Sequence, residues 1–400
     1  MTPSEQQYQA LAAISEWYRN GSKPYFYLGG PAGSGKTTVG RMAVEKCGLD
    51  PDNHRQVKYA SFMGKAALVM SRKGMKAQTI HQLIYTLLEK DNGELVFGLN
   101  RDSELTTARL LLLDECSMIS DSIATDLLSF GVKILVLGDP EQLDPVKGTG
   151  YFTKHTPDFQ LTEIHRQALD NPIIRLSQDI LKDIPIPMGV NGAVKCIPFE
   201  EISPDELLNG DQVLTGMHKT RHELNRLMLE LDGFGIEYPY QVGVKVICRR
   251  NYFKNGMVNG LIGYTTETVT PYDYDEAGRW FNQSVYFEEG LKDHPYIIDK
   301  LKMNMGAFQD NWKPRNDLEK THDDKLIDAS REFAYQSGDD SQIQRIFDFA
   351  YAITGHSSQG SQWDNVILFD DGMMSWKKEA RRKWLYTTVT RAAETLTILV

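Results

Sequence analysis

One uninterrupted segment, Gly30-Pro-Ala-Gly-Ser-Gly-Lys-Thr37, carries residue types that can bind phosphate groups. It fits the pattern G-x-x-x-x-G-K-[ST], in which glycines let the backbone wrap around phosphates while amide hydrogens and a helix start supply positive potential. Lys36 would neutralise the β- and γ-phosphates, and the Thr37 hydroxyl can hold Mg²⁺. The segment therefore predicts a nucleotide site formed by Gly30, Gly33, Ser34, Gly35, Lys36, Thr37 and Thr38.

Two carboxylates, Asp114 and Glu115, directly follow the apolar run Leu110–Leu113. Beside a phosphate loop, Asp114 would hold the Mg²⁺ shell, and Glu115 would orient and deprotonate the attacking water. An Asp-Glu pair alone is usually part of a solvated loop. Here four leucines bury the strand, so they fix where the carboxylates emerge.

A third apolar run, Ile134–Leu137, ends in a polar loop that contains Gln142. A neutral side chain that both donates and accepts hydrogen bonds can sense whether a γ-phosphate is present. Gln142 is the candidate for that role. A glutamine in a surface turn is the alternative interpretation.

Strands and helices must position these side chains, and the apolar spacing predicts where they lie. The pattern predicts helices over 4–19 and 37–47 and strands over 25–28, 57–60, 110–113, 134–137 and 213–215. Strands alternating with helices are typical of parallel sheets that have helices on both faces. We therefore predict an α/β fold.

Two stretches depart from this alternation. Residues 91–101 place turn residues on both sides of a short β-like run, which predicts a small hairpin. Residues 261–344 are first aromatic and β-like and then polar, which predicts an inserted β-rich domain. The α/β pattern resumes at 347–353, 366–369 and 396–399, so the insertion splits a second α/β unit.

The chain has 400 residues with 41% apolar composition, enough for two to three domains with their own cores. Its formal net charge is −10, so a nucleic-acid site must be a local patch. The densest basic cluster is Lys377–Lys383. It is either an electrostatic track for DNA or the solvated face of a helix.

We expect a cytoplasmic protein with no membrane segment, because the apolar runs are strand-sized and residues 1–10 are polar. The four cysteines are scattered without a C-x-x-C pair. This spacing predicts small buried hydrophobic residues in a reducing compartment.

Taken together, the motifs resemble the superfamily 1B DNA helicases of the Dda, RecD and Pif1 group, and the likeness covers nearly the whole chain. The matching pieces are Gln7-x-x-Ala10, the phosphate loop, Gly64–Ala67, Thr79–His81, Asp114–Met118, Gly138–Val146, Leu161–Arg166, Asn259–Gly260, Ala352–Gly360 and Leu385–Arg391.

The resemblance implies two RecA-like parallel-sheet P-loop domains with a small inserted hairpin subdomain and an inserted β-rich, SH3-like domain. The implied division is domain 1A at 1–84 and 109–163, hairpin 1B at 85–108, domain 2A at 164–260 and 345–400, and domain 2B at 261–344.

Residue roles also follow from the resemblance. Gln7 would recognise adenine, although Gln6 is an equally polar neighbour. Arg166 and Arg391 would be arginine fingers that reach across from the second α/β unit to the γ-phosphate, where a guanidinium stabilises the transferring phosphoryl group. The residues implied to lie near the DNA backbone are Lys65, Thr79, His81, Thr354 and His356. For His81, packing at a helix start is the alternative.

Two further positions stand out against the family pattern. Relatives often have lysine in the fifth motif where this chain has Ser357, which predicts a weakened or displaced phosphate contact. Relatives also carry a strand-separating pin between the motifs at Thr79 and Asp114. Phe97 is the only aromatic residue between Tyr85 and Asp114, so it is our candidate for the tip, with packing under its own hairpin as the alternative.

The activity implied is an ATP-dependent DNA helicase that uses ATP and Mg²⁺ and moves 5′ to 3′ on single-stranded DNA. One alternative is a translocase that displaces bound proteins without efficient strand separation, and another is a P-loop switch that only times an interaction. We expect a monomer that acts on single-stranded DNA and DNA forks in replication, recombination or repair. Replication proteins and single-strand-binding proteins are the candidate protein partners.

Overall fold

The computed structural model describes residues 3–89, 95–144, 150–163, 171–234, 241–249, 257–268, 280–287, 296–304, 344–345, 347–373 and 377–400. The helices are α1 Glu5–Asn20, α2 Lys36–Lys46, α3 Gly64–Arg72, α4 Ile80–Ile84, α5 Asp121–Leu128, α7 Pro172–Leu181, α8 Pro204–Leu208, α9 His218–Leu231 and α12 Lys378–Val389. Short 3₁₀ helices occupy Glu104–Thr107, Cys116–Met118 and Phe199–Glu201.

The strands of the first part of the chain are β1 Tyr25–Gly29, β2 Val57–Ser61, β3 Ala77–Thr79, β4 Tyr85–Glu89, β5 Leu95–Leu99, β6 Leu110–Asp114, β7 Lys133–Gly138, β8 Phe159–Gln160, β9 Gly189–Asn191 and β10 Val194–Ile197. They are followed by β11 Gln212–Thr215, β12 Lys245–Cys248, β13 Ile262–Thr265, β14 Trp280–Phe287, β15 Tyr296–Asn304, β16 Gln344–Arg345, β17 Phe347–Phe349, β18 Ala352–Thr354, β19 Trp363–Phe369 and β20 Ala392–Leu399.

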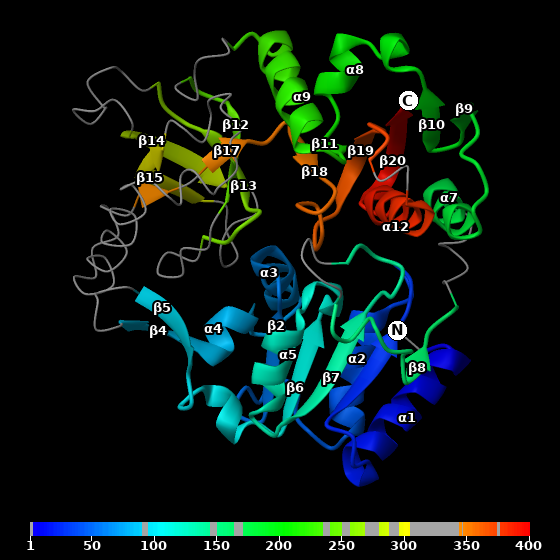
Figure 1. Ribbon diagram of the computed structural model, residues 1–400, viewed down its shortest axis with the longest axis vertical. Helices are drawn as coiled ribbons and strands as arrows, with labels where there is room; N and C mark the ends of the chain where they lie inside the picture. The colour runs from blue at the N-terminus through cyan, green and yellow to red at the C-terminus, as the bar shows by residue number, and fades with distance from the viewer. Residues whose placement is uncertain are drawn as a thin grey trace. The chain divides into compact units, whose positions relative to one another are not determined.

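The chain forms two compact units (Figure 1). The first unit comprises Met1–Cys196, Gln359–Asp364 and Met374–Leu396, and the second comprises Ile197–Ser358, Asn365–Met373 and Thr397–Val400. The segment that carries Arg391 therefore belongs to the first unit, with the phosphate loop.

The first unit is built on the parallel sheet β3-β2-β6-β7-β1-β8. Helix α1 begins where the Ser4 hydroxyl accepts a hydrogen bond from the Gln7 amide, completing a capping box. The predicted helices and strands of this region are confirmed to within a few residues at their ends. The α/β prediction is confirmed.

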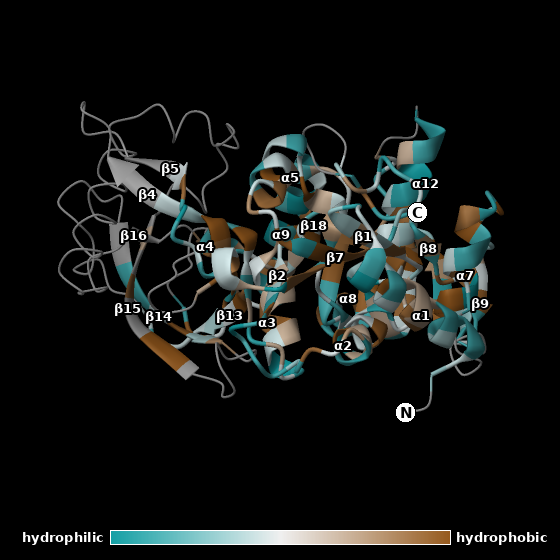
Figure 2. Ribbon diagram, turned by 90° about the horizontal axis from the view of Figure 1, so that it is seen from below, coloured by the Kyte–Doolittle hydropathy of each residue, from teal (hydrophilic) through white to brown (hydrophobic). Residues whose placement is uncertain are grey.

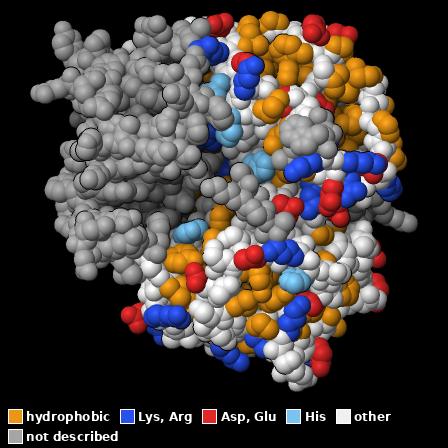
Figure 3. Space-filling view, in the orientation of Figure 1, with side chains coloured by type: hydrophobic (Ala, Val, Ile, Leu, Met, Phe, Trp, Pro, Cys, Tyr) orange, Lys and Arg blue, Asp and Glu red, His pale blue; other side chains and the backbone are white. Residues whose placement is uncertain are grey.

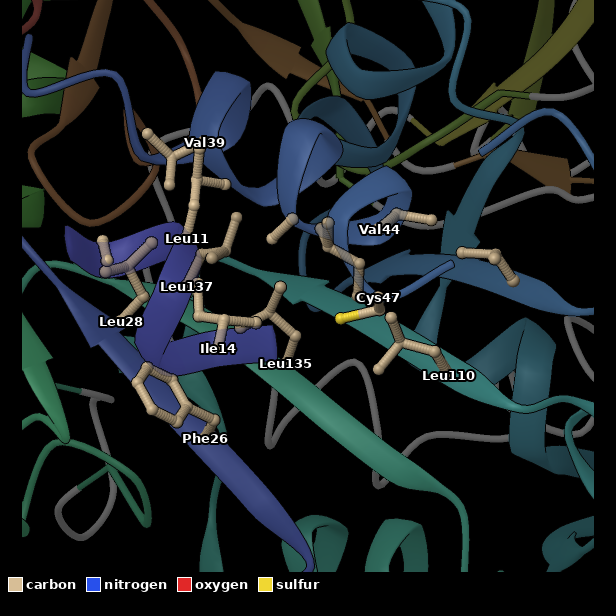
Figure 4. Packing of buried hydrophobic residues seen from close by; sticks show 14 of the residues in the cluster. Leu11, Ile14, Phe26, Leu28, Val39, Val44, Cys47, Leu110, Leu135 and Leu137 are labelled. Atoms are coloured by element: carbon tan, nitrogen blue, oxygen red, sulfur yellow. The ribbon is translucent and has the colours of Figure 1, made fainter. Parts of the chain in front are cut away.

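Side chains from each central strand alternate between two hydrophobic layers, because successive residues of a strand point to opposite faces. Leu110 and Leu112 pack on one face with α1 and α2, whereas Leu111 and Leu113 pack on the other with residues of α4 and α5. Figure 4 shows the first layer, in which Ile14 lies near Leu135 and Leu137. In Figure 2, β7 is hydrophobic and α12 carries mainly hydrophilic residues.

A second sheet has the order β18-β11-β19-β20-β10-β9. Strand β11 pairs in parallel with both β18 and β19, and β9 pairs antiparallel with β10. Helix α9 packs against β11 and β18. These parallel pairs agree with a second α/β unit.

A third sheet, β16-β15-β14-β13-β12-β17, is mostly antiparallel and supports the prediction of a β-rich region. It reaches beyond 261–344, because β12 and β17 belong to it. The sequence pattern treated 347–353 as one stretch of the α/β unit, which is wrong. Phe347–Phe349 pairs with β12 in this sheet, whereas Ala352–Thr354 pairs with β11 in the second. An apolar run predicts that a strand is buried, but it does not identify the strand with which that strand pairs.

The predicted hairpin is present as β4 and β5, which pair antiparallel with Leu87 opposite Phe97. The four cysteines are free and buried, as predicted. No helix in the described part of the chain is long and apolar enough to cross a membrane.

Candidate active site and DNA interface

The phosphate loop connects β1 to α2. Gly33 and Gly35 have φ of 79° and 80°, the left-handed region that glycine adopts without strain. The Gly30 amide donates to the Gly138 carbonyl at 3.1 Å, which ties the loop to the end of β7. Ser34 is buried, and Thr38 lies exposed in the first turn of α2. The loop thus has the conformation and the helix start that a phosphate site requires.

Lys36 is the first residue of α2, and its side chain folds over the loop. Its Nζ donates to the carbonyl of Gly30 at 2.6 Å and to that of Pro31 at 2.9 Å. The ammonium therefore lies where the loop would surround phosphate groups.

Thr37 and Asp114 meet at the end of β6. The Thr37 hydroxyl donates to Asp114 Oδ2 at 3.0 Å, although 77 residues separate the two positions. One hydroxyl and one carboxylate are oxygen ligands of the kind that Mg²⁺ takes in nucleotide sites, where it keeps several waters. The pair fits the predicted role of holding Mg²⁺.

Glu115 follows Asp114 in a strained backbone conformation, with φ of 55°. Residues other than glycine rarely adopt this region, and such strain clusters at functional sites. Loss of water on burial raises the pKa of Glu115, and the neighbouring Asp114 raises it further, whereas Arg391 and Lys36 lower it. A raised pKa makes this carboxylate a better proton acceptor.

Gln142 is 5% exposed, so the surface-turn interpretation is wrong. Its Oε1 atom is buried and has no hydrogen-bond partner among the described residues. Because a buried polar atom without a partner is costly, this oxygen fits a site that is completed by a ligand or its water.

Tyr386, to which the sequence analysis gave no role, links two parts of this site. Its hydroxyl donates to Asp139 Oδ2 at 2.7 Å and accepts from the Ala32 amide at 3.2 Å. Burial raises the pKa of Tyr386 well above 10, so the hydroxyl stays protonated. Tyr386 lies within the motif Leu385–Arg391, and this is the sequence feature by which its role could have been predicted.

Helix α12 also holds the loop that carries Gln142. The Leu143 amide donates to Thr387 Oγ1 at 2.9 Å, and its carbonyl accepts from Gln359 Nε2 at 3.1 Å. Lys383 forms an ion pair with Asp144 at 3.0 Å. Arg382 and Lys378 form further pairs, with Glu141 at 3.9 Å and Asp183 at 3.1 Å. These carboxylates offset part of the charge of the basic cluster 377–383.

Arg391 is 5% exposed, just beyond the end of α12. Its Nε donates to the Thr387 carbonyl at 3.0 Å, its Nη1 to the Ser361 carbonyl at 3.1 Å and its Nη2 to Thr390 Oγ1 at 3.2 Å. The guanidinium is therefore fixed in place, and its charge lowers the pKa of Glu115. Arg166, the other predicted finger, lies outside the described residues.

The two candidate adenine-binding glutamines have different surroundings. Gln7 is buried, and its Nε2 donates to the Ser34 carbonyl of the phosphate loop at 3.2 Å. The Gln6 side chain accepts from the amides of Thr162 and Glu163 at 2.9 and 2.8 Å. Contact with the phosphate loop favours Gln7, and its role stays a prediction.

Three predicted DNA residues lie in the first unit. Lys65 is 3% exposed, with Nζ 4.8 Å from the centre of the Trp363 ring. The buried Thr79 hydroxyl caps α4 by accepting from the Gln82 amide at 3.2 Å. Their DNA contacts stay predictions.

His81 lies at the start of α4, and its ring centroid is 5.9 Å from that of Phe62 and 5.4 Å from that of Tyr85. These contacts agree with packing at a helix start, and its contact with DNA stays a prediction. Burial lowers its pKa, so the imidazole is neutral at neutral pH. The backbone of Phe97 lies in β5, while its side chain is outside the described part of the structure.

Thr354 and His356 lie in the second unit, at the end of β18 and just after it. The Thr354 hydroxyl is buried and lies 3.0 Å from Ser357 Oγ. His356 is half-buried, and loss of water lowers its pKa. The structure therefore brings Thr354 and Ser357 together, and it brings the nucleotide residues together separately in the first unit.

Two family models match parts of this chain. Residues 3–186 match the family described as AAA domain, and residues 349–399 match the UvrD-like helicase C-terminal domain. The resemblance to superfamily 1B helicases is confirmed.

Among curated relatives, the ATP-dependent RecD2 DNA helicase of Deinococcus radiodurans is 28% identical over 292 residues, covering 65% of this chain and 38% of the relative. The ATP-dependent DNA helicase dda of phage T4 is 29% identical over 170 residues, covering 40% of this chain and 38% of the relative. The chain thus spans about two fifths of these two relatives.

The fold also resembles solved structures of Pif1 helicases. Pif1 helicase from Bacteroides, in complex with ADP-AlF3 and single-stranded DNA, aligns with a TM-score of 0.54 and 19% identity, covering 100% of this chain and 92% of that chain. A Pif1 structure concerned with unwinding at forked double-stranded DNA aligns with a TM-score of 0.56 and 18% identity, with the same coverage. At this identity the likeness concerns the fold.

The Tyr386 contacts give a first testable prediction. Tyr386→Phe leaves the buried Asp139 and the Ala32 amide each without one hydrogen-bond partner, which should lower the free energy of unfolding by about 1–3 kcal/mol. Because both groups border the nucleotide site, we also expect a severalfold lower maximal ATPase rate. Urea unfolding and steady-state ATPase assays measure the two effects.

Tyr18→Phe is the matched control, since it removes a hydroxyl from a half-buried tyrosine of α1 in the same unit. Unchanged stability and ATPase rate in Tyr386→Phe would show that the link is dispensable.

Proposed function

We propose that this protein is an ATP-dependent DNA helicase that moves 5′ to 3′ along single-stranded DNA and couples ATP hydrolysis to duplex unwinding. The observation that carries the proposal is the position of Arg391. It belongs to the UvrD-like C-terminal match, lies in the same compact unit as the phosphate loop, and acts electrostatically on Glu115. An arginine so placed counts against a P-loop switch that only times an interaction, because it serves hydrolysis itself.

In this proposal each of several residues of the first unit has its own role in ATP hydrolysis. The phosphate loop and Lys36 bind and orient the triphosphate, and Glu115 accepts the proton of the attacking water. Gln142 responds to the γ-phosphate, and Arg391, with Arg166 as the second finger, stabilises charge on the transferring group. Thr37 and Asp114 would hold Mg²⁺, which when bound offsets phosphate charge.

The partners follow from the same proposal. Single-stranded DNA would contact Lys65, Thr79 and His81 in the first unit and Thr354 and His356 in the second. DNA forks, replication proteins and single-strand-binding proteins are the proposed further partners of a monomer. The six-part division into 1A, 1B, 2A and 2B is part of the proposal, and so is an SH3-like character for the β-rich insertion.

We favour strand separation over translocation alone for two reasons. The relatives named above are helicases, and β4 and β5 form a hairpin where the resemblance predicts a pin. The discriminating experiment uses duplexes that carry either a 5′ or a 3′ single-stranded tail. We expect ATP-dependent unwinding of the 5′-tailed duplex only.

Unwinding from a 3′ tail would reverse the proposed polarity. DNA-stimulated ATPase that displaces a bound protein but leaves both duplexes intact would support the translocase. An ATPase rate unaffected by single-stranded DNA would support the switch.

Phe97 is the proposed tip of the pin, and it carries a second prediction. An aromatic tip can replace the stacking that a melted base pair loses, a few kcal/mol at most per step. Phe97→Ala should therefore slow unwinding of a tailed duplex severalfold while single-strand-stimulated ATPase stays nearly intact. Equal losses in both activities would indicate a folding role, and no loss in either would place the pin elsewhere.

A further inference from the structure

The second unit contains a cationic cluster to which the motifs above assign no role. Its members lie at the start of α9, directly after β12 and in the middle of β17. They are His218, Arg221, His222, Arg249 and Asp348. Figure 3 shows histidine side chains gathered with Lys and Arg on the face of the second unit over α9 and β18.

One carboxylate serves two guanidinium groups in this cluster. Arg221, 3% exposed, bonds through Nη1 to Asp348 Oδ2, and Arg249 Nη2 lies 3.3 Å from the same oxygen. Asp348 Oδ1 accepts from the Phe349 amide at 2.8 Å. Two guanidinium groups therefore share one carboxylate oxygen.

Burial and the two arginines lower the pKa values of the two histidines of α9. The pKa of His218 is lowered to about 4, first by loss of water and then by Arg221 and Arg249. That of His222 is lowered to about 4 by the same loss of water and by Arg221. Both imidazoles are neutral at neutral pH, so the positive charge of the cluster belongs to Arg221 and Arg249.

Arg249 is the member of the pair that reaches the fifth motif. Its side chain is 15% exposed, and its Nη1 lies 3.4 Å from Ser357 Oγ, across 108 residues of sequence. Ser357 Oγ lies 3.0 Å from Thr354 Oγ1. The guanidinium thus lies beside the serine that occupies the lysine position of the relatives.

We propose that Arg249 supplies the cation that Ser357 lacks, so that Arg249, Ser357 and Thr354 together bind one backbone phosphate of single-stranded DNA. The proposal rests on the DNA-binding function proposed above. A guanidinium has five N–H donors, so Arg249 can keep its contact with Asp348 while donating to a phosphate oxygen. The contacts of Arg249 to Asp348 and Ser357, at 3.3 and 3.4 Å, are long for hydrogen bonds, so a phosphate oxygen can compete with either of them for an N–H donor.

The alternative role for Arg249 is purely structural, as an ion pair that holds the end of β12 to β17. A charge-relocation experiment separates the two roles. Binding of fluorescein-labelled oligothymidylate is measured by anisotropy across a range of salt concentrations for wild type, Arg249→Gln, Ser357→Lys and the double variant. Thermal unfolding of each variant is measured in parallel.

Arg249→Gln should weaken oligothymidylate binding about tenfold at low salt, because a charge-assisted hydrogen bond is lost. The slope of log affinity against log salt should become shallower by about 0.7, the value for one phosphate contact on a single strand. Adding Ser357→Lys should restore both affinity and slope, because the cation returns to the position found in the relatives.

Ser357→Lys alone should tighten binding and steepen the slope by at most about one released counterion. We expect this gain to be smaller than the gain in the Arg249→Gln background, because in wild type the new lysine lies beside a like charge. Lys219→Gln is the control. It removes one cation from α9 of the same unit, where the side chain is 84% exposed, and should leave the slope unchanged.

Unchanged affinity and slope in Arg249→Gln would overturn the proposal. So would a double variant that unfolds at the wild-type temperature yet regains no binding. If wild type itself fails to bind oligothymidylate, the proposed DNA-binding function fails, a result that the wild-type titration alone reveals.

Discussion

Glu115→Gln should retain ATP binding while turnover falls by orders of magnitude, about 10²- to 10⁴-fold for loss of a general base. The substitution preserves the shape of a side chain held at φ 55° beside Asp114, and it removes only the group that can accept a proton. Single-strand-stimulated ATPase and equilibrium binding of a fluorescent ATP analogue measure the two properties separately.

Two further variants are compared with Glu115→Gln. Lys36→Ala should abolish hydrolysis and also weaken nucleotide binding, because Lys36 offsets phosphate charge in the ground state. Glu16→Gln makes the same chemical change at an exposed position of α1 and should leave both properties unchanged. Near-normal DNA-stimulated turnover in Glu115→Gln would remove the general-base assignment.

Arg391→Ala should lower the maximal ATPase rate about 10³-fold or more while ATP affinity changes far less, because a finger acts chiefly on the transition state. Steady-state kinetics and equilibrium nucleotide binding give the two quantities. Because Arg391 is buried and donates to Thr387, Thr390 and Ser361, thermal unfolding must be measured beside them.

Arg391→Lys is the second variant of this test. It keeps the charge but lacks the planar fork that makes the three contacts, so we expect most of the rate loss to persist. A loss confined to ATP affinity, with a normal maximal rate, would make Arg391 a binding residue. Full activity in Arg391→Lys would show that charge alone is required.

Local patterns predicted much of the first unit, because adjacent residues encode the properties concerned. The glycines of the phosphate loop specify its backbone conformation, and the leucines before Asp114 specify a buried strand that ends there. The structure confirms both features, with Gly33 and Gly35 in the left-handed region and Leu110–Leu113 fully buried.

Patterns of burial were less informative where the chain passes between sheets. Residues 347–353 form one apolar stretch, yet they divide between an antiparallel and a parallel sheet. Hydrophobicity predicts that a segment is buried, but an apolar strand can pair with a neighbouring strand in either sheet. Likewise, the sequence allowed two interpretations of Gln142, a glutamine in a surface turn or a sensor of the γ-phosphate. Only the burial of its side chain in the structure excluded the surface turn.

The sequence by itself determined which residues can bind a nucleotide or take part in its hydrolysis. These are the phosphate loop and the carboxylates after a buried strand, and they belong to an ordered set of motifs that resembles superfamily 1B. Tertiary structure alone decided which distant groups meet. Tyr386 bonds to Asp139 across 247 residues, and Arg249 reaches Ser357 across 108. Such pairs depend on how the whole chain packs, since neither residue type nor local spacing specifies a partner so far along the sequence.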